Sequence, residues 1–144
     1  MENLKIVEIL LVEDNPGDAR LTQEALKDGK VKNNLHIVYD GLEATDFLFQ
    51  RNQYQNAPRP DLIILDLNLP KKNGKEVLAE IKSDESLKSI PVIILTISKA
   101  EEDVIRSYSL HANCFLIKPI DVNKFFDVVR SIEDFWLSLV TLPK

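Results

Sequence analysis

The sequence predicts an α/β fold, a doubly wound sheet of five parallel strands, and three observations lead to this prediction. Four runs of four apolar residues are each followed by a polar residue, which is typical of strands buried on both faces. Helical patterns separate these runs, so consecutive strands need crossover connections and must be parallel. The length of 144 residues suits one domain with one hydrophobic core.

The first part of the chain predicts a strand, a helix and an edge strand. Residues 7–12 form the first strand. The turn-forming residues 15–18 lead into a helix, which Gly29 ends. Residues 35–39 alternate in the manner of an edge strand. The buried positions expected on the first helix are Ala19, Leu21, Ala25 and Leu26.

Two further helices and a strand are expected next. Asp40 and Gly41 open the second helix. The polar, proline-bearing loop 52–60 leads to a third strand at 62–65, and the loop 69–74 leads to the third helix. The buried positions expected on these two helices are Ala44, Phe47, Leu48, Val77, Leu78 and Ile81.

The last part of the chain continues the alternation. Pro91 begins the fourth strand, and residues 99–110 give the fourth helix. The fifth strand covers 114–117, and Asp121 is a good N-cap for the last helix.

The composition is that of a globular protein and argues against several function classes. The formal net charge is −5 and the tightest basic cluster is the pair Lys71-Lys72, so we expect no nucleic-acid partner. We see no apolar run of membrane-spanning length, no signal peptide and only one cysteine, Cys114, and therefore expect a cytoplasmic protein. Since no linker or repeat divides the chain, we expect one domain over residues 1–144, with a C-terminal tail over about 137–144.

Polar side chains follow the strands at the points where chemistry gathers in this fold class. Glu13 and Asp14 follow the first strand, and Asp66 follows the third. Thr96 and Lys118 follow the fourth and fifth strands. The carboxyl ends of parallel strands meet at one edge of the sheet, so these groups are expected to converge there. Three carboxylates, a hydroxyl and an ammonium together predict a phosphoryl-transfer site.

Three carboxylates this close together repel one another unless a cation lies between them. Hard oxygen ligands without His or Cys favour Mg²⁺, with Mn²⁺ possible, and the backbone carbonyl of Asn68 is a candidate additional ligand. The alternative for each acid alone is a strand end meeting solvent, or, for Asp14 with Asn15, a helix cap.

Asp66 is the best candidate to accept the phosphoryl group as an aspartyl-phosphate. The Thr96 hydroxyl can hydrogen-bond one phosphoryl oxygen. The Lys118 ammonium can pair with another oxygen, or with Asp66 before phosphorylation, and Pro119 restricts Lys118 to an extended geometry. The alternatives are a helix-capping role for Thr96 and a solvent-directed lysine for Lys118.

These residues resemble the response-regulator receiver domain of two-component signalling. The resemblance covers essentially the whole chain and rests on residues 11–15, 65–70 with 73–74, 95–96 and 118–119. It implies a CheY-like, flavodoxin-like sheet of strand order 2-1-3-4-5 with five helices.

The resemblance also implies a role for each matching residue. Phosphorylation would draw the Thr96 hydroxyl toward the phosphoryl group and let Phe115 turn inward to fill the vacated space, which would change the face formed by the fourth helix, fifth strand and fifth helix. The implied roles are phosphoacceptor for Asp66, magnesium-holding acids for Glu13 and Asp14, main-chain metal ligand for Asn68, switch hydroxyl for Thr96, phosphate-sensing cation for Lys118 and rotating aromatic for Phe115.

A narrower resemblance is to the single-domain response regulators of cyanobacterial phytochromes. It rests on the insertion at 54–60, on 110–114 and on the tail at 135–143. It implies a phytochrome-type histidine kinase as partner; the sequence does not identify a downstream target.

The last helix carries more apolar residues than one buried stripe requires, and an exposed apolar patch usually marks an interface. We expect a homodimer through the fourth and fifth helices and the tail; the alternative is a longer helix folded back on its own domain. The stripe consists of Phe125, Val129, Ile132 and Trp136. The residues expected at the interface are Phe126, Phe135, Trp136, Leu139 and Leu142.

The preferred function is a signalling protein that is not an enzyme and only gains and loses its own phosphoryl group. Two other function classes are alternatives to it. A magnesium-dependent phosphatase of the haloacid-dehalogenase kind needs a second acid two residues after the nucleophile, and that residue here is Asn68. A phosphate-independent interaction module has no need of a costly carboxylate cluster. Nucleotide binding is disfavoured by the lack of a glycine-rich phosphate loop.

Overall fold

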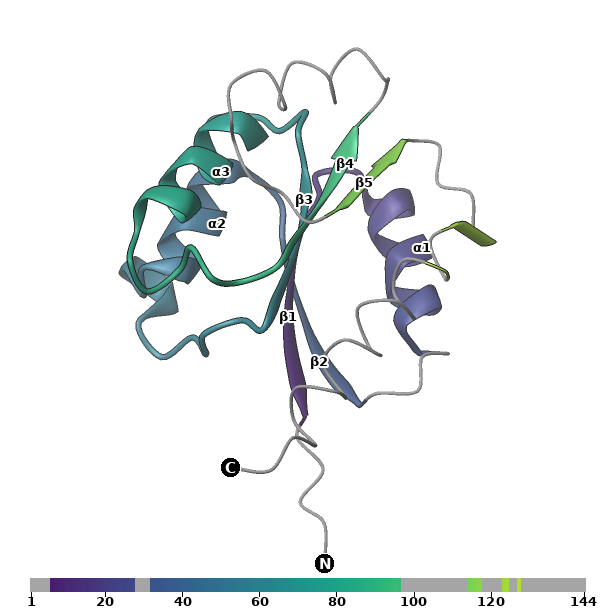
Figure 1. Ribbon diagram of the computed structural model, residues 1–144, viewed down its shortest axis with the longest axis horizontal. Helices are drawn as coiled ribbons and strands as arrows, with labels where there is room; N and C mark the ends of the chain where they lie inside the picture. The colour runs from purple at the N-terminus through teal and green to yellow at the C-terminus, as the bar shows by residue number, and fades with distance from the viewer. Residues whose placement is uncertain (1–5, 28–31, 97–113, 118–122, 125–126, 128–144) are drawn as a thin grey trace, which may run out of the picture.

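A computed structural model of the 144-residue chain describes residues 6–27, 32–96, 114–117, 123–124 and 127 (Figure 1). Within these residues we find no helix with the length and apolar character needed to cross a membrane. The elements, in chain order, are β1 (Val7–Val12), α1 (Pro16–Lys27), β2 (Asn33–Val38), α2 (Gly41–Leu48), the 3₁₀ helix η1 (Asn52–Tyr54), β3 (Leu62–Asp66), α3 (Gly74–Ser83), β4 (Val92–Thr96) and β5 (Cys114–Ile117).

The strands of the described residues form one five-stranded parallel sheet in the order β2-β1-β3-β4-β5, which confirms the predicted topology. β2 is an edge strand, as predicted, but it covers Asn33–Val38 rather than 35–39. Tyr39 follows the end of β2 and is 48% exposed. The sheet order puts β1 directly beside β3, which decides which strand ends can share a site.

The remaining strand bounds lie within one residue of the prediction. β3 extends to include Asp66, and β4 begins at Val92 rather than at Pro91. Two predictions lie outside the described residues, namely the helix end at Gly29 and the fourth helix at 99–110, as does the predicted cap of the last helix at Asp121. Of that last helix the structure describes only residues 123–124 and 127, which are helical.

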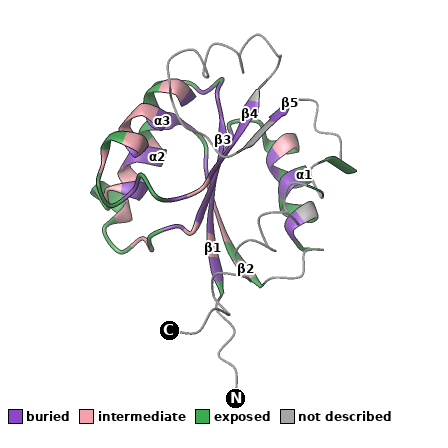
Figure 2. Ribbon diagram, viewed as in Figure 1, coloured by how far each residue is buried: buried purple, intermediate pink, exposed green. Residues whose placement is uncertain are grey.

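Helices cover both faces of the sheet, with α1 on one face and α2 and α3 on the other (Figure 1). The side chains of β1 alternate between two cores accordingly. Leu10 and Val12 pack in the core of α2 and α3, and Ile9 and Leu11 pack in the core of α1. Figure 2 shows the described residues of the inner strands buried over most of their length, as apolar runs between two helical layers should be.

The predicted buried faces of α2 and α3 are confirmed, whereas one prediction for α1 is wrong. Ala19 and Leu26 of α1 are buried as expected, but Leu21 is 45% exposed. The buried stripe of α1 runs instead through Thr22, which is 1% exposed and lies three residues after Ala19 and four before Leu26. The side chain of Ala25 lies outside the described part of the structure.

Side chains at the N-termini of α2 and α3 satisfy backbone donors there. Asp40 accepts a hydrogen bond of 2.8 Å from the Glu43 amide, which confirms that Asp40 opens α2. Asn73 and Glu76 form a reciprocal capping box at α3, with bonds of 3.0 and 3.1 Å. The sequence predicts that Asn73 is part of the loop before α3. In the structure Asn73 is the N-cap residue, and α3 begins directly after it at Gly74.

The polar loop after α2 is held to the domain by Tyr54. The Tyr54 ring packs against Phe47 at a centroid distance of 5.4 Å, and its hydroxyl donates a hydrogen bond of 2.8 Å to Glu43 Oε1. Burial, followed by the hydrogen bond to the Glu43 carboxylate, raises the pKa of Tyr54 to about 12.

This shift predicts a pH dependence at the alkaline end. The folded-state pKa of about 12 exceeds the ordinary value of 10.0, so the contribution of Tyr54 to stability is complete below about pH 10 and is lost as the pH rises through about 12. Tyrosinate absorbance of the wild type minus that of Tyr54→Phe, which keeps the ring, isolates this titration. We expect a midpoint near 12, and a midpoint near 10 would contradict both the burial of Tyr54 and its hydrogen bond to Glu43.

Candidate functional site

The register of the sheet brings the carboxyl ends of β1, β3, β4 and β5 to one edge. Val12 pairs with Leu65 and Asp66 pairs with Leu95, so the residue after β1 lies beside the last residue of β3. At the other side of the edge, Thr96 ends β4 and is paired with Ile117 at the end of β5. Because all these pairs are parallel, the polar residues of separate segments meet here.

Three carboxylates gather at this edge: Glu13, Asp14 and Asp66 each offer an oxygen, and these oxygens lie within 4.8 Å of one another. Glu13 is 0% exposed and Asp66 is 1% exposed, whereas Asp14 is exposed. The capping alternative, given for Asp14 with Asn15, holds for Asn15, because the Asp18 amide at the start of α1 donates to Asn15 Oδ1 at 3.0 Å, whereas Asp14 belongs to the carboxylate cluster.

Backbone amides orient two of these carboxylates. The Asn15 amide donates to Glu13 Oε2 at 3.1 Å, and the Asn68 amide donates to Asp66 Oδ1 at 2.9 Å. Each donor lies two residues after the acid that it contacts, so the turn that ends each strand also fixes its carboxylate. Both bonds hold a carboxylate oxygen in a fixed position at the place where a metal ion or an electrophilic phosphorus would meet it.

The arrangement fits a hard divalent cation. Two unit charges 4.8 Å apart repel by about 3.5 kcal/mol at an effective dielectric constant of about 20, and this applies best to the buried pair Glu13 and Asp66, since water screens the two pairs that include the exposed Asp14. A divalent cation among the oxygens converts this repulsion into attraction. Mg²⁺ and Mn²⁺ favour oxygen ligands such as carboxylates. The three residues of this cluster offer carboxylate oxygens and no softer ligand such as a cysteine sulfur.

The structure describes the remaining predicted site residues only in part. The backbone of Asn68 lies at the cluster and that of Thr96 at the same edge, but the side chains of Thr96 and Phe115 and the whole of Lys118 lie outside the described residues. Their roles remain predictions, as does the interface. The interface residues outside the described part are Phe126, Phe135, Trp136, Leu139 and Leu142.

Two glycines support the site in a way that the sequence analysis missed. A Cβ on Gly74 would lie 2.4 Å from the carbonyl oxygen of Asp66. A Cβ on Gly41 would lie 1.8 Å from the carbonyl oxygen of Lys72. Only glycine permits these approaches. The Asn-Gly pair at 73–74 signals a tight turn, but which backbone it approaches is decided by the tertiary structure.

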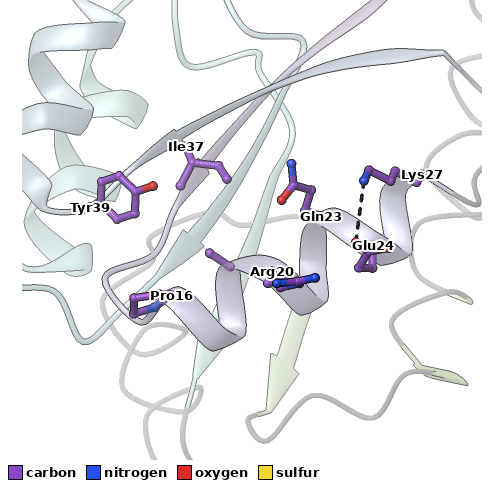
Figure 3. A pocket seen from close by; sticks show the side chains of 8 residues that line it. Pro16, Arg20, Gln23, Glu24, Lys27, Ile37 and Tyr39 are labelled. Carbon is purple, nitrogen blue, oxygen red and sulfur yellow. Dashed lines mark ion pairs between the residues drawn. The ribbon is translucent and has the colours of Figure 1, made fainter.

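A groove of about 300 Å³ lies elsewhere, between α1 and β2 (Figure 3). Arg20, Gln23 and Lys27 line it from the helix, and Ile37 lines it from the strand. None of the three clustered carboxylates lines this groove, so the candidate phosphoryl-transfer site is the edge of the sheet and not the groove.

Comparison with known proteins agrees with this geometry. A family model described as the response regulator receiver domain matches residues 9–130. The chain belongs to this family. It is 56% identical over 135 residues to the response regulator Rcp1 of Synechocystis sp., an alignment that covers 94% of this chain and 92% of that protein.

Two solved structures extend the comparison. The crystal structure of the Mn²⁺-bound form of Rcp1 aligns with a TM-score of 0.79 at 55% identity, covering 96% of this receiver domain and 99% of that chain. The phosphorylated cyanobacterial phytochrome response regulator RcpA aligns with a TM-score of 0.80 at 53% identity, covering 97% and 100%. Receiver domains bind Mg²⁺ or Mn²⁺, and the acidic cluster supplies this chain with suitable oxygens.

Gly74→Ala tests the close packing beside Asp66. The added Cβ meets backbone at 2.4 Å, so we expect a loss of about 1–3 kcal/mol in unfolding free energy, measured by urea denaturation, and weaker Mn²⁺ binding. Gly17→Ala is the matched control, because its Cβ would meet only a side-chain oxygen at 3.3 Å. Equal stability of the two variants would contradict the close approach.

Proposed function

We propose that this receiver domain accepts a phosphoryl group on Asp66 from a histidine kinase and signals through the resulting change of shape. The observation that carries this proposal is the meeting of Glu13, Asp14 and Asp66 within 4.8 Å at the edge where the strands end. Membership of the receiver family and the similarity to Rcp1 and RcpA support it.

The transfer is a single displacement at phosphorus. A carboxylate oxygen of Asp66 attacks the phosphorus of a phosphohistidine, a P–O bond forms, the P–N bond breaks, and its electron pair stays on the histidine nitrogen. The Asn68 amide holds the attacking carboxylate through its 2.9 Å hydrogen bond. Glu13 and Asp14 would hold the divalent cation, with the Asn68 carbonyl as a further ligand. When bound, the cation offsets the charge on the phosphoryl oxygens.

The signal depends on residues around the new charge. Phosphorylation adds about −1.5 to −2 charges and three acceptor oxygens at one point. In the proposed mechanism the Thr96 hydroxyl and the Lys118 ammonium each bind one of these oxygens. Phe115 then fills the space behind Thr96, which changes the face formed by the fourth helix, β5 and the fifth helix.

The partners proposed for this chain follow from its relatives. The donor is a phytochrome-type histidine kinase, as supported by the similarity to the phytochrome response regulator RcpA and to a bacteriophytochrome response regulator at 40% identity. We further propose that the protein is cytoplasmic, that it forms a homodimer through the last helix and tail, and that it catalyses no reaction beyond gain and loss of its own phosphoryl group.

The proposal is tested by incubation with acetyl phosphate and Mg²⁺ followed by intact mass measurement. The wild type should gain one phosphoryl group and Asp66→Asn none. Asp40→Asn is a suitable control, because it removes a carboxylate outside the cluster while asparagine still caps α2. It should gain phosphate as the wild type does. Phosphate on Asp66→Asn at the wild-type level would exclude Asp66 as the acceptor.

A further inference from the structure

The loop that joins β3 to α3, residues 67–73, is fastened to Asp66 at its near end. The Gly74 amide donates to the Leu67 carbonyl at 3.0 Å, and the Asn68 amide donates to Asp66 Oδ1 at 2.9 Å. Any shift of this loop therefore moves the group that orients the acceptor carboxylate, together with the carbonyl proposed as a metal ligand.

The far end of the loop is fastened by the side chain of Lys72. Its ammonium donates to Glu80 Oε2 on α3 at 2.6 Å and to Thr45 Oγ1 on α2 at 3.4 Å. The Lys72 side chain is only 21% exposed, and Thr45 is 1% exposed. The Lys72 ammonium thus joins the loop to both α2 and α3, and its contact with Thr45 is made to a buried residue.

Thr45 is suited to receive this bond. Its single hydroxyl proton is shared between the carbonyls of Leu42 and Gly41, at 3.1 and 3.3 Å, and this direction leaves its lone pairs to accept from Lys72. A valine at this position would keep the shape and lose the acceptor.

The backbone of the loop is pressed against α2 at the same place. A Cβ on Gly41 would lie 1.8 Å from the Lys72 carbonyl oxygen, and the Gly41 amide donates to the Pro70 carbonyl at 3.4 Å. Between these contacts Lys71 has a φ of 69°, and the Lys72 amide donates across it to the Pro70 carbonyl at 2.8 Å. This is the pattern of a strained γ-turn, which persists only where the surrounding structure enforces it.

We propose that Lys72 is a positioning residue for the phosphoryl-transfer site. Its ammonium fastens the far end of the loop to α2 and α3, and through the loop it holds Asn68 and Asp66 in the geometry that binds the cation and accepts phosphorus. The inference rests on the proposed function of Asp66.

The sign of one effect separates positioning from simple electrostatics. Removal of a positive charge near an acidic cluster favours a cation there, so a purely electrostatic role predicts tighter Mg²⁺ binding in Lys72→Met. Positioning predicts weaker binding, because the loop loses its anchor. Thr45→Val leaves the net charge unchanged, so electrostatics predicts no change for it, whereas positioning again predicts weaker binding.

The experiment compares Lys72→Met and Thr45→Val with Lys71→Met in the full chain. Lys71→Met removes the same charge from the neighbouring residue, whose side chain is 63% exposed and pairs with Asp40 at 3.4 Å. Mg²⁺ dissociation constants come from calorimetric titration, and rate constants for phosphorylation by acetyl phosphate are measured at saturating Mg²⁺. Circular dichroism of each variant establishes the folded fraction to which the constants refer.

We expect the Mg²⁺ dissociation constant of Lys72→Met to rise about three- to tenfold, less than for a group that touches a ligand directly. Its phosphorylation rate constant should fall as well, and Thr45→Val should follow in both readouts with a smaller change. Lys71→Met should stay within about twofold of the wild type. Unchanged or tighter Mg²⁺ binding in Lys72→Met would overturn the inference. Failure of the wild type itself to take phosphate would instead overturn the proposed function, while the Mg²⁺ constants would still decide the role of Lys72.

Discussion

The structure depends on tolerating mutual repulsion between carboxylates that the sheet forces together. Glu13 follows β1 and Asp66 ends β3, and these strands are neighbours because of the order β2-β1-β3-β4-β5. Both acids are buried, so water screens their charges poorly. The register of the two strands therefore keeps the backbones of these two acids side by side.

The apolar strands make this arrangement affordable in free energy. Leu10, Leu11, Ile63 and Ile64 of the two strands are each 0% exposed, and they pack between helices on both faces. Full burial of such a side chain contributes about 1.5–3 kcal/mol, so a few of them offset the repulsion within the cluster. The site is therefore held in a strained electrostatic state by packing, and a cation relieves that state.

The two sides of the site are supported differently. On the side of α2 and α3, the loop 67–73 is held by Gly41, Gly74 and Lys72 through close backbone contacts and an ion pair. Under the proposed function, the change in charge at Asp66 is transmitted in the other direction, toward β4 and β5. Because the loop on this side of the site is held in place, a structural change at Asp66 would be confined to the side of β4 and β5. Such a confined change suits a two-state switch better than a deformation spread over the whole site.

The sequence predicted the sheet well, because a short run of large apolar residues is best buried as a strand between two layers of helices. It failed where burial does not follow hydrophobicity: Thr22 takes the buried position on α1 that was assigned to Leu21. It also predicted which acids meet, since strand ends of a parallel sheet coincide. The role of Lys72 was invisible, because adjacent lysines are typical of an exposed turn and only the tertiary structure brings Thr45 and Glu80 to the second of them.

The central claim is that the acids that follow β1 and the acid that ends β3 share a single divalent cation. Anomalous diffraction from crystals grown with Mn²⁺ tests it directly. We predict one strong peak among Glu13, Asp14 and Asp66, with an oxygen of at least one of these carboxylates at about 2.0–2.4 Å from it. A map with no peak at this edge of the sheet, or with peaks only beside other acidic residues, would contradict the account.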